Sequence, residues 1–182
     1  MYMSRFLHSA LPTLLVFGLS SPAPAPRTPA QRSPDDPTAL ATFEALVTYD
    51  IETAGIAAKK SAKSDIRDLA SSFEQGHRGL LKQTEDLAAK LNMTPTPPKE
   101  APLGQAHADA LSKLNATTGE EFDRVFLANE VAYHDGAIKI LNETLLPAIK
   151  NPQLKAAVTA AIPAFQAHLA ASQKTAAKYH VI

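Results

Sequence analysis

The amino-acid sequence predicts an all-α protein whose main domain, residues 38–180, is a four-helix bundle. Only 7 of the 182 residues are glycine and alanine is abundant, a composition that favours helices over strands. Apolar residues recur every three or four positions in four long segments, as on the buried face of an amphipathic helix. The helices expected from these segments cover residues 37–60, 65–92, 118–149 and 152–179.

The first two predicted helices are joined by a short turn and therefore form an antiparallel hairpin. Pro37 suits the first turn of a helix, where its missing N–H would have no partner. After the turn, Ser64 is expected to cap the second helix and Asp65 to complement its dipole. The second helix carries a pronounced apolar stripe, in which His77 lies among leucine and phenylalanine side chains.

The last two predicted helices form a second hairpin. The third helix starts with Thr118-Gly-Glu-Glu121, a sequence that matches a capping box. The turn at Asn151-Pro152 ends the third helix and opens the fourth. Pro163 lies inside the apolar pattern of the fourth helix, so a kink is expected there.

A long connection separates the two hairpins. It covers residues 93–117 and contains Pro95, Pro97, Pro98 and Pro102, so only a short helix over residues 105–114 is expected within it. A helix as long as the second one measures about 42 Å, and a connection of this size can travel that distance. Two antiparallel hairpins joined by one long crossover form the ferritin-like arrangement.

The N-terminal segment has the pattern of a targeting sequence. Residues 1–21 are predicted to be a signal peptide and residues 22–37 a proline-rich linker, with Ala23-Pro24-Ala25 matching the small-residue cleavage pattern. The apolar run of the signal is shorter than the roughly 20 residues that a membrane-spanning helix needs. The mature protein is therefore expected to be periplasmic or secreted, with no stable membrane span after signal removal.

Composition excludes several classes of function. Lys+Arg and Asp+Glu number 18 each, so the chain lacks the basic excess typical of proteins that bind nucleic acid. It has no cysteine, which excludes disulfides, thiolate metal sites and a cysteine nucleophile. It also has no glycine-rich phosphate loop, no GxSxG motif and no nucleophile triad. The sequence therefore does not favour an enzyme.

Three histidines lie on the predicted inward faces of three different helices. These are His77, His134 and His168. His134 and His168 are equally far from the turn at Asn151, so they share one level of the bundle. The crossover topology brings His77 close to the same level.

Acidic side chains are expected near these histidines. Asp50 and Glu52 lie in the corresponding part of the first helix, and Glu130 lies one turn before His134. Burying such groups together is costly unless they pair with one another or bind a cation. The candidate metal ligands are Asp50, Glu52, His77, Glu130, His134 and His168.

Two interpretations of these residues stay open. Imidazole and carboxylate are ligands for iron, zinc, copper or manganese, so the interior can hold one transition-metal ion. Alternatively, the groups form a metal-free, hydrogen-bonded polar layer in a non-catalytic envelope or stress-related structural or interaction protein. A di-iron oxidase is disfavoured because the Glu-x-x-His pattern of such sites occurs once, at Glu74 and His77, and not twice. The other histidines, expected to be incidental, are His8, His107 and His180.

The chain also resembles a known family over residues 38–179. The resemblance rests on Asp50-Ile51-Glu52, on His77, on Gly119-x-x-Phe122-Asp123-Arg124-x-Phe126-Leu127, on Val131-x-x-His134 and on Ile162-Pro163-x-x-x-x-His168-Leu169. In these features the sequence is similar to the DUF4142 family of exported bacterial proteins, which is assigned to the ferritin-like superfamily. The resemblance implies a ferritin-like fold and export. It implies little about function, since the biochemical activity of the family is largely unassigned. The family usually has an acidic residue just before the histidine of the second helix, where this chain has Gly76.

Overall fold

The computed structural model describes residues 33–99 and 102–181. All regular secondary structure in this part of the chain is helical. The long helices are α1 (Asp36–Lys60), α2 (Ser64–Lys90), α4 (Gly119–Lys139) and α6 (Pro152–Lys178). The shorter elements are α3 (Pro102–Ala116), the π-helix η2 (Ile140–Leu145) and α5 (Leu146–Ala148). The predicted all-α class is confirmed. The predicted signal peptide and most of the predicted linker lie outside the described residues.

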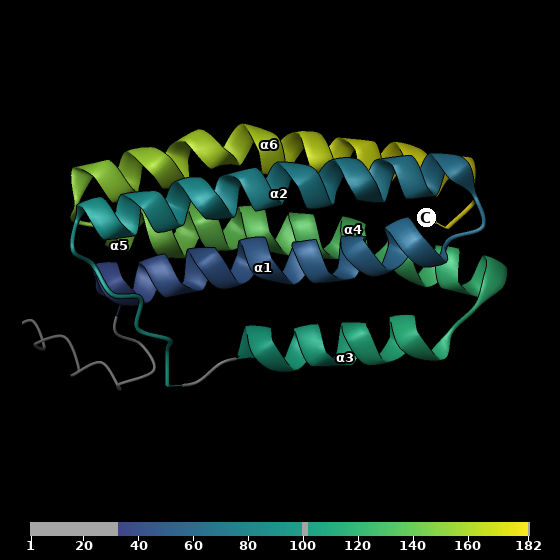
Figure 1. Ribbon diagram of the computed structural model, residues 1–182, viewed down its shortest axis with the longest axis horizontal. Helices are drawn as coiled ribbons and strands as arrows, with labels where there is room; N and C mark the ends of the chain where they lie inside the picture. The colour runs from purple at the N-terminus through teal and green to yellow at the C-terminus, as the bar shows by residue number, and fades with distance from the viewer. Residues whose placement is uncertain (1–32, 100–101, 182) are drawn as a thin grey trace, which may run out of the picture.

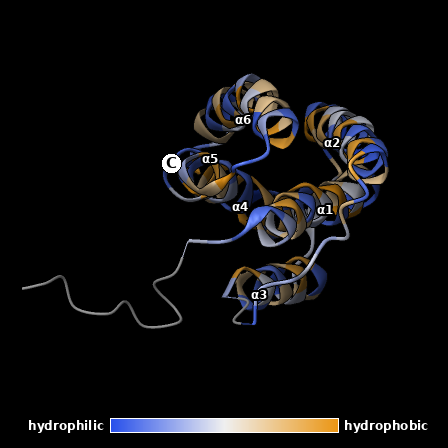
Figure 2. Ribbon diagram, turned by 90° about the vertical axis from the view of Figure 1, so that its left-hand side faces the viewer, coloured by the Kyte–Doolittle hydropathy of each residue, from blue (hydrophilic) through white to orange (hydrophobic). Residues whose placement is uncertain are grey.

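The four long helices lie side by side, and α3 lies outside them (Figure 1; Figure 2). The largest contacts pair α1 with α2 and α4 with α6, while α3 packs against α1 and α4. In Figure 1, α3 lies along the outside of the bundle and runs toward the end of the molecule where α4 begins. Part of the connection between the two pairs is thus a helix on the outside of the bundle. Across residues 33–99 and 102–181, no helix has the length and apolar character that crossing a membrane requires.

Two of the long helices begin with side-chain caps that also fix one end of the molecule. The Asp35 carboxylate accepts a hydrogen bond from the Thr38 N–H at 3.0 Å, and the Asn151 side chain accepts from the first turn of α6. The carboxylate of Asp36 accepts from the backbone N–H groups of Lys150 and Asn151, at 2.7 and 2.9 Å. The start of α1 is thereby tied to the turn that precedes α6.

Two predicted caps are wrong. Ser64 is the first residue of α2 and not its cap, because the helix begins one residue earlier than expected and Lys63 takes the cap position. Thr118 precedes α4 but its side chain makes no capping hydrogen bond. Gly119 has a φ of +60°, and this left-handed residue directly after Thr118 breaks the regular first turn that a capping box requires.

The third predicted helix is not one regular α-helix. Its hydrogen-bonding pattern changes to a π-helix over Ile140–Leu145, and a short α-helical turn containing Pro147 follows. A proline has no N–H and its ring crowds the carbonyl four residues earlier, so the wider π turn just before Pro147 relieves a conflict within the helix. By contrast, α6 continues as a helix through Pro163.

The core consists of two apolar clusters with polar residues between them. One cluster includes Phe43, Leu141 and Phe165, and the other includes Phe73 and Phe126, all essentially buried. Every long helix carries at least one polar residue where the two clusters meet. These interposed residues are Asp50 and Thr53 on α1, His77 on α2, Glu130 and His134 on α4, and His168 on α6.

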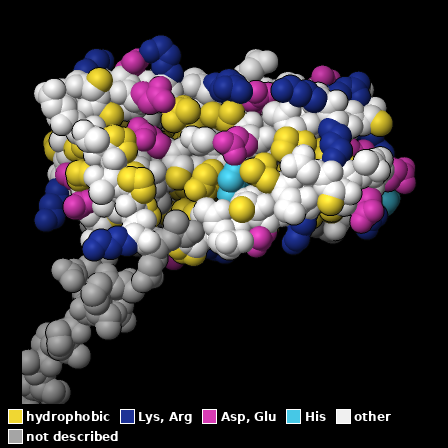
Figure 3. Space-filling view, turned by 60° about the horizontal axis from the view of Figure 1, so that its bottom comes forward, with side chains coloured by type: hydrophobic (Ala, Val, Ile, Leu, Met, Phe, Trp, Pro, Cys, Tyr) yellow, Lys and Arg dark blue, Asp and Glu magenta, His cyan; other side chains and the backbone are white. Residues whose placement is uncertain are grey.

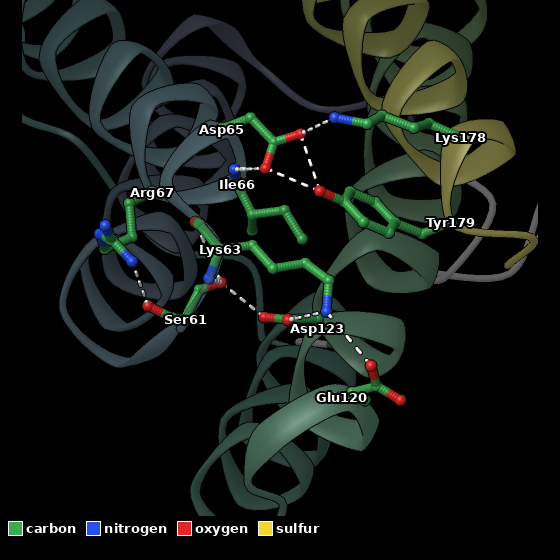
Figure 4. Close-up of polar contacts among 9 residues, drawn as sticks. All are labelled: Ser61, Lys63, Asp65, Ile66, Arg67, Glu120, Asp123, Lys178 and Tyr179. Atoms are coloured by element: carbon green, nitrogen blue, oxygen red, sulfur yellow. Dashed lines mark hydrogen bonds and ion pairs between the residues drawn. The ribbon is translucent and has the colours of Figure 1, made fainter.

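Polar contacts tie together the end of the molecule where α6 finishes (Figure 4). The buried carboxylate of Asp123 accepts a hydrogen bond from the Ser61 hydroxyl at 2.6 Å, and its other oxygen lies 3.4 Å from the Lys63 ammonium. Nearby, Asp65 accepts hydrogen bonds from the Lys178 ammonium at 2.7 Å and from the Tyr179 hydroxyl at 2.8 Å. These contacts join the α1–α2 turn to the beginning of α4, and the beginning of α2 to the end of α6.

Asp123→Ala is expected to lower the free energy of unfolding by about 1–3 kcal/mol, because it leaves the buried Ser61 hydroxyl without its acceptor. Urea denaturation followed by circular dichroism measures the change. Glu120→Ala is the matched control, since Glu120 faces the same lysine but its side chain is 91% exposed, and it should have little effect. Equal losses in the two variants would show that the buried contact does not matter.

Candidate metal centre

Each long helix contributes one side chain to a cluster in the interior. The four-residue cluster consists of Asp50 from α1, His77 from α2, His134 from α4 and His168 from α6. One nitrogen or carboxylate oxygen from each residue lies within 4.8 Å of those of the other three. Asp50, His77 and His134 are at most 1% exposed, and His168 is half-buried.

The spacing of the cluster suits one metal ion. Nε2 of His77 lies 2.9 Å from Oδ2 of Asp50 and 3.1 Å from Nδ1 of His168. Nε2 of His134 lies 3.7 Å from the same Asp50 oxygen. Ligand bonds of 2.0–2.1 Å in a tetrahedral site place neighbouring donor atoms about 3.3 Å apart. Two of the three observed distances are shorter than this value, and the distance between His134 and Asp50 is longer.

Several donor atoms of the cluster lack a hydrogen-bond partner. Among the described residues, both carboxylate oxygens of Asp50 and Nε2 of His134 are buried and accept no hydrogen bond. Nε2 of His77 and Oδ2 of Asp50 are 2.9 Å apart, but this contact does not have the geometry of a hydrogen bond. Buried polar atoms are nearly always paired, so unpaired lone pairs that converge on one point require an explanation.

A backbone contact sets the orientation of His134. Its Nδ1 lies 2.9 Å from the carbonyl oxygen of Glu130, one turn earlier on α4. Because a carbonyl can only accept, Nδ1 carries the proton and Nε2 presents its lone pair to the cluster. Histidines that bind metals commonly donate their second ring nitrogen in this way.

Burial and neighbouring groups favour an ionised Asp50 and neutral His134 and His168 imidazoles. Burial raises the pKa of Asp50, but the contacts with His77 and His134 outweigh it, and the pKa is lowered overall. Burial lowers the pKa of His134, and burial together with His77 lowers the pKa of His168 to about 4. An ionised Asp50 and neutral His134 and His168 are the protonation states that a metal ion needs in these ligands.

Glu130 lies beside the cluster and is fully buried. Its Oε1 accepts from the Thr53 hydroxyl at 3.4 Å, and its Oε2 lies 3.6 Å from Nδ1 of His134. Burial, followed by repulsion from Asp50, raises the pKa of Glu130 well above its usual value. Burial thus favours the protonated form of Glu130 next to the four-residue cluster, and works against a second anionic ligand there.

Glu130→Gln is expected to make the native state more stable at pH 7–8 and to flatten the pH dependence of stability. The native state keeps a proton on Glu130 that the unfolded chain loses above its ordinary pKa of 4.5. Stability therefore falls as the pH rises from that value toward the raised native pKa, and glutamine, which does not titrate, removes this loss. Urea denaturation of both proteins between pH 4 and pH 8 measures the effect. Parallel curves would show that Glu130 is ionised in the native protein.

The structure places two other acidic side chains away from the cluster. Glu52 is two positions after Asp50, which turns it to the other side of α1, where its half-exposed side chain contacts Nε2 of His107 at 2.6 Å. Glu74 pairs with Arg78 on the outside of α2, at 2.7 Å, and not with His77. His107 is thus not incidental, since it also stacks on Tyr49 with a 4.1 Å separation between ring centroids.

The fold and the cluster together define an all-helical protein with a candidate metal centre to which each long helix contributes one ligand. The sequence profile of the family described as "Domain of unknown function (DUF4142)" matches residues 21–175. Since this match covers most of the chain, the protein belongs to the DUF4142 family.

One solved structure has a similar fold. It is the crystal structure of a DUF305 fragment from Deinococcus radiodurans, with a TM-score of 0.69 and 15% sequence identity. The similarity covers 78% of this chain and 95% of that one, so the described helices are arranged much as in that fragment. At this identity the likeness concerns the fold alone. A search of curated proteins finds no match.

Proposed function

We propose that this protein is an exported, ferritin-like four-helix bundle that binds one transition-metal ion in its interior. The proposed ligands are Asp50, His77, His134 and His168. One observation carries the proposal. Buried donor atoms of Asp50 and His134 have no hydrogen-bond partner among the described residues, and they lie at distances suited to ligands of one ion. Export to the periplasm or out of the cell is proposed from the signal-peptide pattern of residues 1–21.

The ligand set favours a single borderline cation. Three imidazoles and one carboxylate suit zinc, copper(II) or iron(II), and manganese is less well matched because it prefers oxygen ligands. A second ion would need further anionic ligands, but burial disfavours the ionised form of Glu130, and Glu52 lies on another face of α1. These positions support one ion and not the paired metals of a di-iron enzyme.

A metal-free polar layer is the second candidate. The 3.1 Å contact between the rings of His77 and His168 favours it, because one ring can donate to the other without an ion. In that case the buried groups serve a structural or interaction role in the cell envelope. A hydrogen bond between His77 and His168 nevertheless leaves the Asp50 carboxylate and Nε2 of His134 without hydrogen-bond partners among the described residues.

Metal content decides between the two candidates. We expect the full chain, purified without a histidine tag, to bind one equivalent of Zn²⁺ or of the spectroscopic probe Co²⁺ in calorimetric and absorbance titrations. His134→Gln should abolish stoichiometric binding, because it removes the oriented Nε2. His107→Gln is the matched control, since it removes a histidine outside the cluster and should leave binding intact. Absence of binding in the unaltered protein would leave the metal-free layer as the function of these residues.

A further inference from the structure

A groove between α2 and α6 reaches the four-residue cluster from the surface. It encloses about 360 Å³, and His77 and His168 are among its lining residues. The remaining lining residues include small ones on both helices, among them Gly76, Gly79 and Ala164. Glycine destabilises a helix interior relative to alanine, so two glycines at this part of α2 keep the groove open at a cost to the helix.

The groove meets the cluster at its one accessible ligand. His168 is half-buried, whereas Asp50, His77 and His134 are at most 1% exposed. A Cβ atom placed on Gly76 would lie 3.7 Å from both Cε1 and Nε2 of His168, so the imidazole sits directly against a helix that carries no side chain there. His77 also lines the groove, and its buried Nδ1 has no hydrogen-bond partner among the described residues. The groove therefore reaches the cluster at the His168 imidazole, with the His77 ring next to it.

A second cavity lies on the opposite side of the cluster but suits an ion poorly. It encloses about 270 Å³ beneath α3, is lined mainly by apolar residues such as Leu46, Leu103 and Ile140, and includes none of the four candidate ligands. Figure 3 shows the face that carries α3, where one histidine lies among hydrophobic side chains with an acidic side chain beside it. A hydrated cation loses its water at high cost in apolar surroundings, which disfavours passage through this cavity.

We propose that the α2–α6 groove is the passage by which a divalent cation reaches and leaves the site, and that His168 is the ligand it meets first. This inference rests on the proposed function. The cation exchanges water for the His168 imidazole at the floor of the groove, and the buried donors of His77, Asp50 and His134 then complete its coordination. Release follows the same steps in reverse, so His168 is the exchanging ligand.

Rates of metal binding test the passage separately from the site. The full chain is mixed with Co²⁺ alone in a stopped-flow spectrometer, and dissociation is followed after addition of excess chelator. The test variant is Gly79→Leu/Ala164→Leu, which fills the groove from both helices without altering a ligand. A Cβ at Gly79 meets no heavy atom within 4 Å, and leucine is a better helix former than glycine, so the variant should fold. Circular dichroism verifies this.

Both the association and the dissociation rate constants are expected to fall about ten-fold in the double variant, which leaves the Kd unchanged. Gly136→Leu is the matched control. Gly136 is also a helical glycine with free space at Cβ, but it lines the cavity beneath α3, so this variant should leave both rate constants unaltered. Unaltered rate constants in the double variant, or lower ones in Gly136→Leu, would overturn the proposed passage but not the proposed metal site. A chain that binds no Co²⁺ at equilibrium would overturn the proposed function itself, and the passage with it.

Discussion

Zinc at a thousand times its Kd is expected to raise the free energy of unfolding of this protein by about 4 kcal/mol. An ion that binds only the native state stabilises it by mass action, and here the four proposed ligands come together only when all four long helices are packed. Urea denaturation with Zn²⁺ and with a chelator measures the difference. The effect is large because the whole stability of a domain of this size is typically about 5–15 kcal/mol.

Asp50→Asn is expected to remove most of this stabilisation. Asparagine keeps the size of the side chain but withdraws the one negative charge among the four ligands. A variant that binds the ion a hundred-fold more weakly retains only about 1.4 kcal/mol at the same zinc concentration. Glu52→Gln is the matched control, because it removes a carboxylate from the same helix but outside the cluster, and it should respond to zinc like the unaltered protein. Equal responses of Asp50→Asn and the unaltered protein would place the ion elsewhere.

Phe165→Ala is expected to lower the free energy of unfolding of the metal-free protein by about 3–5 kcal/mol. The ring is fully buried, so its removal loses apolar burial and leaves a cavity. It also packs against two of the candidate ligands, with ring-centroid distances of 4.9 Å to His77 and 5.9 Å to His134. The variant should therefore also bind Zn²⁺ more weakly, since the two imidazoles lose a neighbour that fixes their orientation.

Phe43→Ala separates these two effects. Its ring is equally buried and belongs to the same apolar cluster, so the loss of stability should be similar. Its zinc affinity, measured by calorimetry at a temperature where both variants are folded, should stay close to that of the unaltered protein. If both variants lose affinity equally, the weaker binding reflects general loosening of the core and not the loss of support for the histidines.

The helices and the common level of the three histidines could be predicted because both depend on sequence spacing. The 3.6-residue period marks the buried face of each helix, and counting from the Asn151 turn places His134 and His168 opposite each other. The same period, applied more strictly, separates Asp50 from Glu52, since two positions along a helix correspond to a rotation of about 200°. Spacing therefore contained the signal that distinguishes the buried acid from the exposed one.

Other features depend on contacts between segments distant in sequence. The raised pKa of Glu130 arises from its burial and from Asp50 on another helix, and no local pattern gives that proximity. The role of His107 depends on how α3 packs beside Glu52 and Tyr49. The failed capping box at Thr118 depends on the left-handed conformation of Gly119, which the motif alone does not reveal.

The distribution of the four ligands over four helices has a consequence for how the chain withstands damage. The hydrogen-bonded pair His77 and His168 alone spans 91 positions of the sequence, and Asp50 and His134 come from two further helices. An ion held by all four ligands would act as a cross-link that closes long loops, as disulfides do in many secreted proteins, in a chain that has no cysteine. A cross-link of this kind would resist proteases while the ion is bound and disappear in the presence of a chelator, so the lifetime of the protein would follow the supply of metal.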